Sequence, residues 1–153
     1  MSTAEAQVRS FIARFDPKHQ TLIRALRRAL RKRFPTAHEL VYDNYNFLVF
    51  GFCASERPTS CIVSLAAGAN GVGLSFPYVG TKLPDPHKLL QGSGTSNRFI
   101  RLPTAATLAR PEVEALIAAA IARAKTPLPT TGKGPLVIRS ISAKQRPRRA
   151  SRS

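Results

Sequence analysis

The first part of the chain carries hydrophobic residues at the spacing of amphipathic helices. Four of them follow the i, i+3, i+4, i+7 pattern of a helix with one buried stripe: Val8, Phe11, Ile12 and Phe15. Asp16 and Pro17 then supply an N-cap and a first-turn proline, so we expect a second helix to begin there. The apolar side chains of this second segment gather on one side, and Pro35 ends it.

The middle of the chain has the period-two alternation of β-strands. The pairs Asp43-Asn44 and Asn70-Gly71 mark turns between apolar runs. The segments with strand patterns are residues 39–52, 60–68, 71–80, 99–102 and 136–141.

Pro111 opens a last long helix with a buried apolar stripe. Helices followed by an antiparallel meander and a further helix indicate an α+β fold. We therefore predict one α+β domain over residues 1–142, with an antiparallel sheet of about five to six strands. Two N-terminal helices and one C-terminal helix are expected to flank the sheet. Residues 143–153 are predicted to form a disordered basic tail.

Length and composition agree with this organisation. A chain of 153 residues suits one domain, and a hydrophobic content of 43% is ordinary for a folded protein. The polar start of the chain does not resemble a secretory signal, and no apolar run approaches the roughly 18 residues needed to cross a bilayer. We expect a cytoplasmic protein that has no membrane partner.

The two cysteines, Cys53 and Cys61, fall in neighbouring strand candidates around a turn that contains Pro58, so they could sit near each other. In a reducing compartment they are most simply two buried thiols. Such a pair alone has neither the spacing nor the number of ligands of a zinc site or a redox motif. The sequence predicts no metal site and no cofactor.

The formal net charge of +16 is the most unusual bulk property. It is concentrated in two segments without acids, residues 18–33 and 139–152, so we expect two basic patches on a nearly neutral domain. A nucleic acid or another polyanion could bind there, and the alternative is a face that is merely solvated with counterions. The candidate nucleic-acid-binding residues are Arg24, Arg27, Arg28, Arg31 and Lys32 in the second helix, and Arg146, Arg148 and Arg149 in the tail. Having no aromatic residue, the tail can attract phosphates but cannot distinguish bases.

With these elements placed, the chain resembles the YdhG-like domain family, small bacterial domains of unknown function that are grouped with frataxin-like folds. Three segments carry the resemblance: FPTAHELVYDNYNFLVFGF (residues 34–52), LPDPHKLLQGSGTSNRFIRL (residues 83–102) and LVIRSISAKQRPRR (residues 136–149). The resemblance implies an antiparallel sheet flanked by helices, and it supplies no catalytic residues. Some relatives of the broader group are linked to intracellular iron delivery.

The loop QGSGTSNR is a second candidate site. It lacks the spacing of a P-loop and the third glycine of a dinucleotide-binding motif. Its glycines could nevertheless turn backbone N–H groups toward an anion, and its hydroxyl and arginine side chains could add donors. The candidate residues are Gly92, Ser93, Gly94, Thr95, Ser96, Arg98 and Arg101. The alternative interpretation is a tight turn whose hydroxyls bind only local backbone.

No catalytic constellation stands out, so an enzyme is not favoured, although residues distant in sequence could still converge. We expect a small non-enzymatic binding module that engages polyanions such as nucleic acid. One alternative is a frataxin-like iron carrier, which the scarcity of clustered acids disfavours. Another is a domain that binds a phosphorylated metabolite through the loop at residues 92–96.

Overall fold

The computed structural model describes residues 3–150. Two helices precede the sheet, α1 (Ala4–Ile12) and α2 (Pro17–Arg33). The strands are β1 (His38–Asp43), β2 (Leu48–Cys53), β3 (Cys61–Gly68), β4 (Gly71–Phe76), β5 (Arg98–Arg101) and β6 (Leu136–Ile141). Helices α3 (Ala105–Leu108) and α4 (Pro111–Ala122) lie between β5 and β6 in sequence, and short 3-10 turns occupy Pro58–Ser60 and Gly80–Lys82.

The sheet has the order β5-β4-β3-β2-β1-β6, and this confirms an α+β fold within the described residues. The prediction of a wholly antiparallel sheet is wrong, because β6 pairs with β1 in parallel. The reason lies in the return path. After α4 the chain travels to the end of the sheet where β1 begins, and the Glu39 N–H donates to the Pro135 carbonyl at 2.9 Å. A strand that enters from that end must run beside β1 in the same direction, and the long connection through α3 and α4 permits this.

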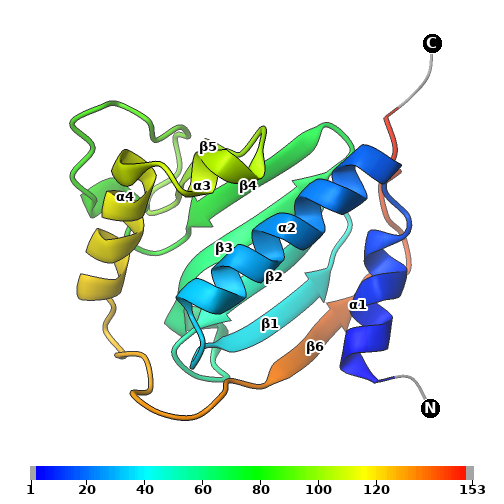
Figure 1. Ribbon diagram of the computed structural model, residues 1–153, viewed down its shortest axis with the longest axis horizontal. Coiled ribbons are helices and arrows are strands. Elements are labelled where there is room, and N and C mark those ends of the chain that lie inside the picture. The colour runs from blue at the N-terminus through cyan, green and yellow to red at the C-terminus, as the bar shows by residue number, and fades with distance from the viewer. Residues whose placement is uncertain (1–2, 151–153) are drawn as a thin grey trace.

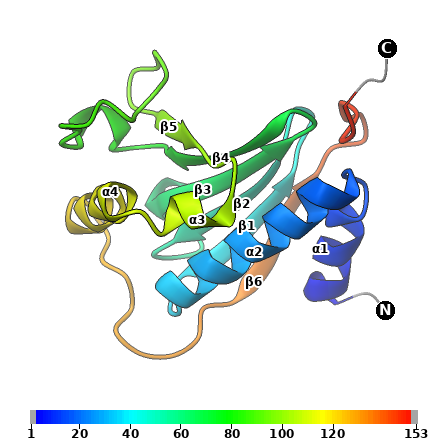
Figure 2. The same cartoon turned by 45° about the horizontal axis from the view of Figure 1, so that its top comes forward.

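The helices lie on one face of the sheet. Figure 1 shows α2 running along the strands, with α1 beside β6 and α4 on the opposite side of α2 from α1, and Figure 2 shows the helices together on one side. Prolines at the first turns of α2 and α4 start both helices as predicted, and the Thr3 hydroxyl accepts a hydrogen bond from the Ala6 N–H at 3.1 Å. None of the helices in residues 3–150 is long and apolar enough to cross a membrane.

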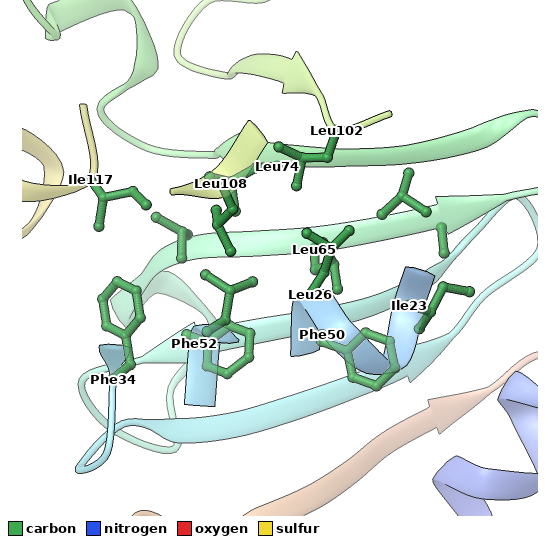
Figure 3. Close-up of a cluster of buried hydrophobic side chains, with 14 of the residues drawn as sticks. Ile23, Leu26, Phe34, Phe50, Phe52, Leu65, Leu74, Leu102, Leu108 and Ile117 are labelled. Carbon is green, nitrogen blue, oxygen red and sulfur yellow. The ribbon is translucent and has the colours of Figure 1, made fainter. Parts of the chain in front are cut away.

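The core fills the space between the helices and this face of the sheet (Figure 3). Strand alternation decides which residues enter it. In β2, Phe50 and Phe52 point into the core, while Gly51 and Cys53 lie on the other face. Phe34, at the end of α2, stacks on Phe52 with ring centroids 5.9 Å apart, so the C-terminal end of α2 is fixed against the sheet.

Residues 143–150 lie against the domain, and this differs from the predicted disordered tail. The Arg146 N–H donates to the Tyr45 carbonyl at 2.8 Å, and the Gln145 amide donates to the Asp43 carbonyl at 2.9 Å. Arg148 is only 4% exposed. Basic composition alone predicts disorder, whereas these residues find partners at the end of β1. Its last three residues, 151–153, lie outside the described part of the chain.

Candidate functional site

A groove of about 680 Å³ opens between α1 and the C-terminal half of α2, and we call it the basic groove. Residues before β6 close one end of it, where the chain passes very close to the segment after α2. An added Cβ at Gly134 would lie 1.6 Å from the Ala37 carbonyl oxygen, so only glycine fits there. The charged residues that line the groove are Glu5, Arg9, Arg24, Arg27, Arg28, Arg31, Lys32, Glu39 and Lys133.

A buried arginine organises the floor of the basic groove. Arg27 projects from α2 between Glu39 of β1 and Glu5 of α1. Its Nε lies 2.7 Å from Glu39 Oε2, and its Nη1 lies 2.7 Å from Glu5 Oε1. Second hydrogen bonds join Arg27 Nη2 to Glu39 Oε1 at 3.2 Å and to Glu5 Oε2 at 3.3 Å. Three elements are thereby tied together by one guanidinium that pairs in forked geometry with both carboxylates.

The ionisation of this network follows from its hydrogen bonds. Burial by itself would lower the pKa of Arg27, but the hydrogen bonds to Glu39 and Glu5 outweigh burial and raise it. The hydrogen bond from Arg27 lowers the pKa of Glu5, against the opposing effect of burial. Arg27 and Glu5 therefore both stay charged at neutral pH. The Arg27 guanidinium also lies 5.5 Å from the centroid of the Phe50 ring.

Arg31 completes the floor one turn further along α2. It lies 3.5 Å from an oxygen of Glu5 and 3.5 Å from an oxygen of Glu39, which is at the long end of an ion pair. The two arginines and the two glutamates balance in charge. The acids that line the basic groove are thus already neutralised by the floor.

Five further cations line the basic groove, and none has a carboxylate partner within residues 3–150. We call them the groove cations: Arg9, Arg24, Arg28, Lys32 and Lys133. Three of them repeat every four residues along α2, so they form a row with a spacing of roughly 6 Å along the helix axis. Like charges in such a row repel one another, and an anion in the groove relieves that repulsion.

The predicted helix residues therefore divide into two groups. Arg24, Arg28 and Lys32 are exposed and line the basic groove, in agreement with a face open to solvent. Arg27 is 8% exposed and serves as a structural cation, and Arg31 shares the same two glutamates. Arg27 therefore has no free donor face to offer to a polyanion.

The tail arginine at position 148 is also a structural residue. Its Nη2 lies 3.0 Å from Asp43 Oδ1 and 2.6 Å from the Asn44 carbonyl oxygen. Asp43 is 1% exposed, and its other oxygen accepts a hydrogen bond from Arg14 at 3.0 Å. The ring of Phe15 lies 6.0 Å from the Arg148 guanidinium. This buried ion pair fastens the tail to the end of β1.

Arg146 and Arg149 remain exposed but also contact the domain. The Arg146 guanidinium lies 5.6 Å from the centroid of the Tyr45 ring, which is 49% exposed. Arg149 lies 3.8 Å from Asp16 and donates to the Arg14 carbonyl at 3.3 Å. These contacts are made just beyond the C-terminal end of α1, whereas Glu5 of the basic groove lies in its first turn. Within residues 3–150, none of the tail arginines lines the basic groove.

The glycine-rich loop folds back on itself. Arg98 Nη1 donates to the Gly94 carbonyl at 2.6 Å and to the Asn97 carbonyl at 2.7 Å. The Ser96 hydroxyl donates to the Pro77 carbonyl at 2.9 Å, and Gly92 has a positive φ of 115°. For Arg98 and Ser96 these contacts favour the turn interpretation, because both side chains donate to backbone carbonyls of the protein itself.

The remaining loop candidates do not converge. Ser93 and Thr95 are exposed, and Arg101 instead lines a separate hollow with Lys18 and His19 at the start of α2. The loop precedes β5 at one edge of the sheet, whereas the basic groove lies beside β1 and β6 at the other. Figure 1 shows this separation between the β4–β5 connection and α1. The two candidate anion sites are therefore distinct.

Two groove cations were not among the residues predicted from the sequence. Arg9 faces the groove from α1, four residues after Glu5, and Lys133 reaches it from the segment before β6. Arg9 is a single charge on a mixed helix, and Lys133 lies in a segment with the composition of a linker. No local signal marks either residue, since only the tertiary structure brings them to α2.

The acids at the groove floor and at the end of β1 are already paired with arginines. Glu5 and Glu39 bind Arg27, and Asp43 binds Arg148 and Arg14. Among residues 3–150, no group of three or more His, Cys, Asp or Glu side chains is placed to hold a metal ion. The iron-carrier alternative thus gains no support from these contacts.

Comparisons with known proteins found no matching family model, no matching curated protein and no matching solved structure.

Proposed function

We propose that this chain is a small non-enzymatic module that binds polyanions, with nucleic acid the foremost candidate, through the basic groove. The groove cations carry this proposal. They surround a concave surface whose two acids are already neutralised by Arg27 and Arg31, so the unpaired charge around the groove is positive. Closely spaced phosphates would supply the missing negative charge.

Recognition in the groove would depend on charge more than on base identity. The aromatic residues at its base, Phe34 and Phe52, are 2% and 1% exposed, so neither offers a face for stacking a base. Binding would therefore be governed by phosphate contacts and would weaken steeply with salt. Five such contacts would give a slope of log affinity against log salt of about −4.5 for duplex DNA and about −3.5 for a single strand.

Three expectations from the sequence form part of the same proposal. They are the resemblance to YdhG-like domains, a cytoplasmic location and the absence of catalysis. The resemblance rests on the three segments quoted above. The tail contributes less to the proposed binding surface than expected, because Arg148 is buried in an ion pair with Asp43.

A fluorescence anisotropy titration of labelled duplex and single-stranded DNA at several salt concentrations tests the proposal. The groove variant carries Arg24→Gln, Arg28→Gln and Lys32→Gln. The matched control carries Lys82→Gln, Lys88→Gln and Lys125→Gln, which remove the same charge from exposed positions outside the groove.

We expect the groove variant to bind more weakly and to lose about 2–3 units of salt slope on duplex DNA, while the control variant stays near the wild type. Equal losses in the two variants would show that only the total charge matters. Absence of binding by the wild type at low salt would contradict the proposal outright.

A further inference from the structure

The two cysteines face each other across neighbouring strands. Cys53 ends β2 and Cys61 begins β3, and the sheet register places them directly opposite each other. The register shifts between Phe52 and Cys53, so one strand carries an extra residue at this point. This irregularity brings both cysteines to the same face of the sheet, where an L-residue at position 51 would also project.

The two sulfur atoms lie close together. Each Sγ is 3.4 Å from the point that a Cβ at position 51 would occupy, so Gly51 leaves the space that the thiols share. The Cys61 thiol also donates to the Val63 carbonyl at 3.2 Å. Both cysteines are free thiols in this structure.

The two cysteines differ in their exposure to solvent. Cys53 is buried at 1% exposure, whereas Cys61 is partly exposed. Neither belongs to the hydrophobic core between the helices and the sheet. A small reagent that approaches the face opposite the helices would therefore reach Cys61 first.

Two sulfurs define the chemistry of this site. Within residues 3–150, no third His, Cys, Asp or Glu joins the pair to make a metal cluster. Directly opposed residues of an antiparallel pair have Cα atoms about 4.5–5.5 Å apart, and a disulfide requires about 4.4–6.8 Å. The pairing of Cys53 with Cys61 in the register is therefore compatible with a disulfide between them.

We propose that Cys53 and Cys61 form a redox-active dithiol that a low-molecular-weight disulfide converts into a cross-strand disulfide. The Cys61 thiolate attacks one sulfur of the reagent, forms a mixed disulfide and releases one thiolate. The Cys53 thiolate then attacks Cys61 Sγ, forms the Cys53–Cys61 bond and releases the second thiolate. The two cysteines lose two protons and two electrons, and the reagent is reduced to two thiols.

The surroundings of the Cys61 thiol determine how fast thiol–disulfide exchange is expected to be. The hydrogen bond with the Cys53 thiol, and then burial, raise the pKa of Cys61 well above its ordinary value. Little thiolate is present at neutral pH, so exchange should be slow there and should accelerate as the pH rises.

The test is incubation of the full chain with oxidised glutathione, followed by intact-mass measurement. We expect the wild type to lose two hydrogens without retaining glutathione. The Cys53→Ser variant should stop at one glutathione adduct on Cys61, and the Cys61→Ser variant should remain largely unmodified in the folded state. Thermal melting of the oxidised wild type should rise by roughly 5–10 °C, and reduction should reverse the rise.

Several results would overturn the proposal. They are a stable glutathione adduct on the wild type, equal modification of the two single variants, and loss of two hydrogens only after denaturation. Circular dichroism of each variant checks that it folds. If a serine variant is unfolded, peptide mapping of the partly oxidised wild type decides instead, because the mixed disulfide must appear on Cys61 rather than on Cys53. The proposal is independent of the basic groove, which neither cysteine lines.

Discussion

The basic groove and the tail each contain a buried ion pair between β1 and an arginine, but the residues around the two ion pairs differ. In each, a carboxylate on β1 binds a buried arginine from another element: Glu39 binds Arg27, and Asp43 binds Arg148. Strand alternation places these two acids on the same side of the sheet, facing the helices.

The surroundings of the two ion pairs are not alike. Around Asp43, the neighbouring arginines are also engaged, since Arg14 binds the second oxygen of Asp43 and Arg149 lies near Asp16. Around Glu39, the groove cations remain without acidic partners in the described chain. The comparison teaches that a run of arginines in sequence does not by itself make a binding surface. The local balance of cations and acids in the folded domain decides between structure and recognition.

The largest effect is expected from breaking the ion pair that holds the tail. Asp43→Ala would leave the Arg148 guanidinium, with 2% of its side chain exposed, without its carboxylate partner. Removal of one partner from a buried pair costs about 3–5 kcal/mol. Urea denaturation measures the loss, and the salt slope of DNA binding should change little. A loss below about 1 kcal/mol would mean that the tail is not fastened as described.

The second largest effect on stability is expected at the buried Arg27, and the adjacent, exposed Arg28 is its control. Arg27→Gln leaves Glu39 buried with only the long contact to Arg31, and we expect a loss of about 2–4 kcal/mol in the free energy of unfolding. Arg28→Gln makes the same charge change on an exposed side chain and should stay within about 0.5 kcal/mol. The order should reverse for DNA affinity among variants that remain folded. Equal stability of the two variants would remove the distinction between structural and free cations.

A smaller effect is expected where the tail contacts Tyr45. Arg146→Gln removes the guanidinium from an exposed ring, and exposed cation–π contacts contribute about 0.5–1 kcal/mol. Thermal melting at constant pH measures this change, with Lys144→Gln as the control of equal charge. Identical melting temperatures for the two variants would show that the Tyr45 contact contributes nothing.

The smallest expected effect is the pH dependence of the stability that Glu5 contributes at the floor of the groove. The pKa of Glu5 is lower in the folded protein than its ordinary value of 4.5, chiefly because of the hydrogen bond from Arg27. Its stabilising contribution is therefore present above that ordinary value and is lost as the pH falls through the lower folded pKa. Because 40% of the side chain is exposed, solvent screens the contribution. Melting curves of the wild type and Glu5→Gln from about pH 6 to about pH 3 should converge on acidification, and curves that stay parallel would contradict the assignment.

Local patterns in the sequence predicted the elements better than their partners. The helical spacing of Val8, Phe11 and Ile12 corresponds to α1, and the proline at position 17 corresponds to the start of α2, because a helix is determined largely by its own residues. The helix ends earlier than predicted, so Phe15 is buried from the turn between α1 and α2. The direction of β6 could not be predicted in the same way. It depends on where the chain returns after α4, and the close passage of Gly134 by Ala37 fixes that path.

The candidate site shows the same limit. The basic face of α2 was visible from helical periodicity, but the burial of Arg27 was not, because its partners come from α1 and β1. Arg148 pairs with Asp43 across 105 residues of sequence, and no local pattern reveals this ion pair. The basic composition of the tail therefore indicates disorder, although the fold supplies a partner. Lys133 joins the groove for the same tertiary reason.

The most direct test compares salt slopes for DNA binding between the groove variant defined above and a tail variant. The tail variant carries Lys144→Gln, Arg146→Gln and Arg149→Gln, so both lose the same charge from exposed positions. The groove variant should lose about 2–3 units of slope and the tail variant less than about one. A tail variant that loses as much slope as the groove variant, or more, would contradict the assignment of polyanion binding to the basic groove.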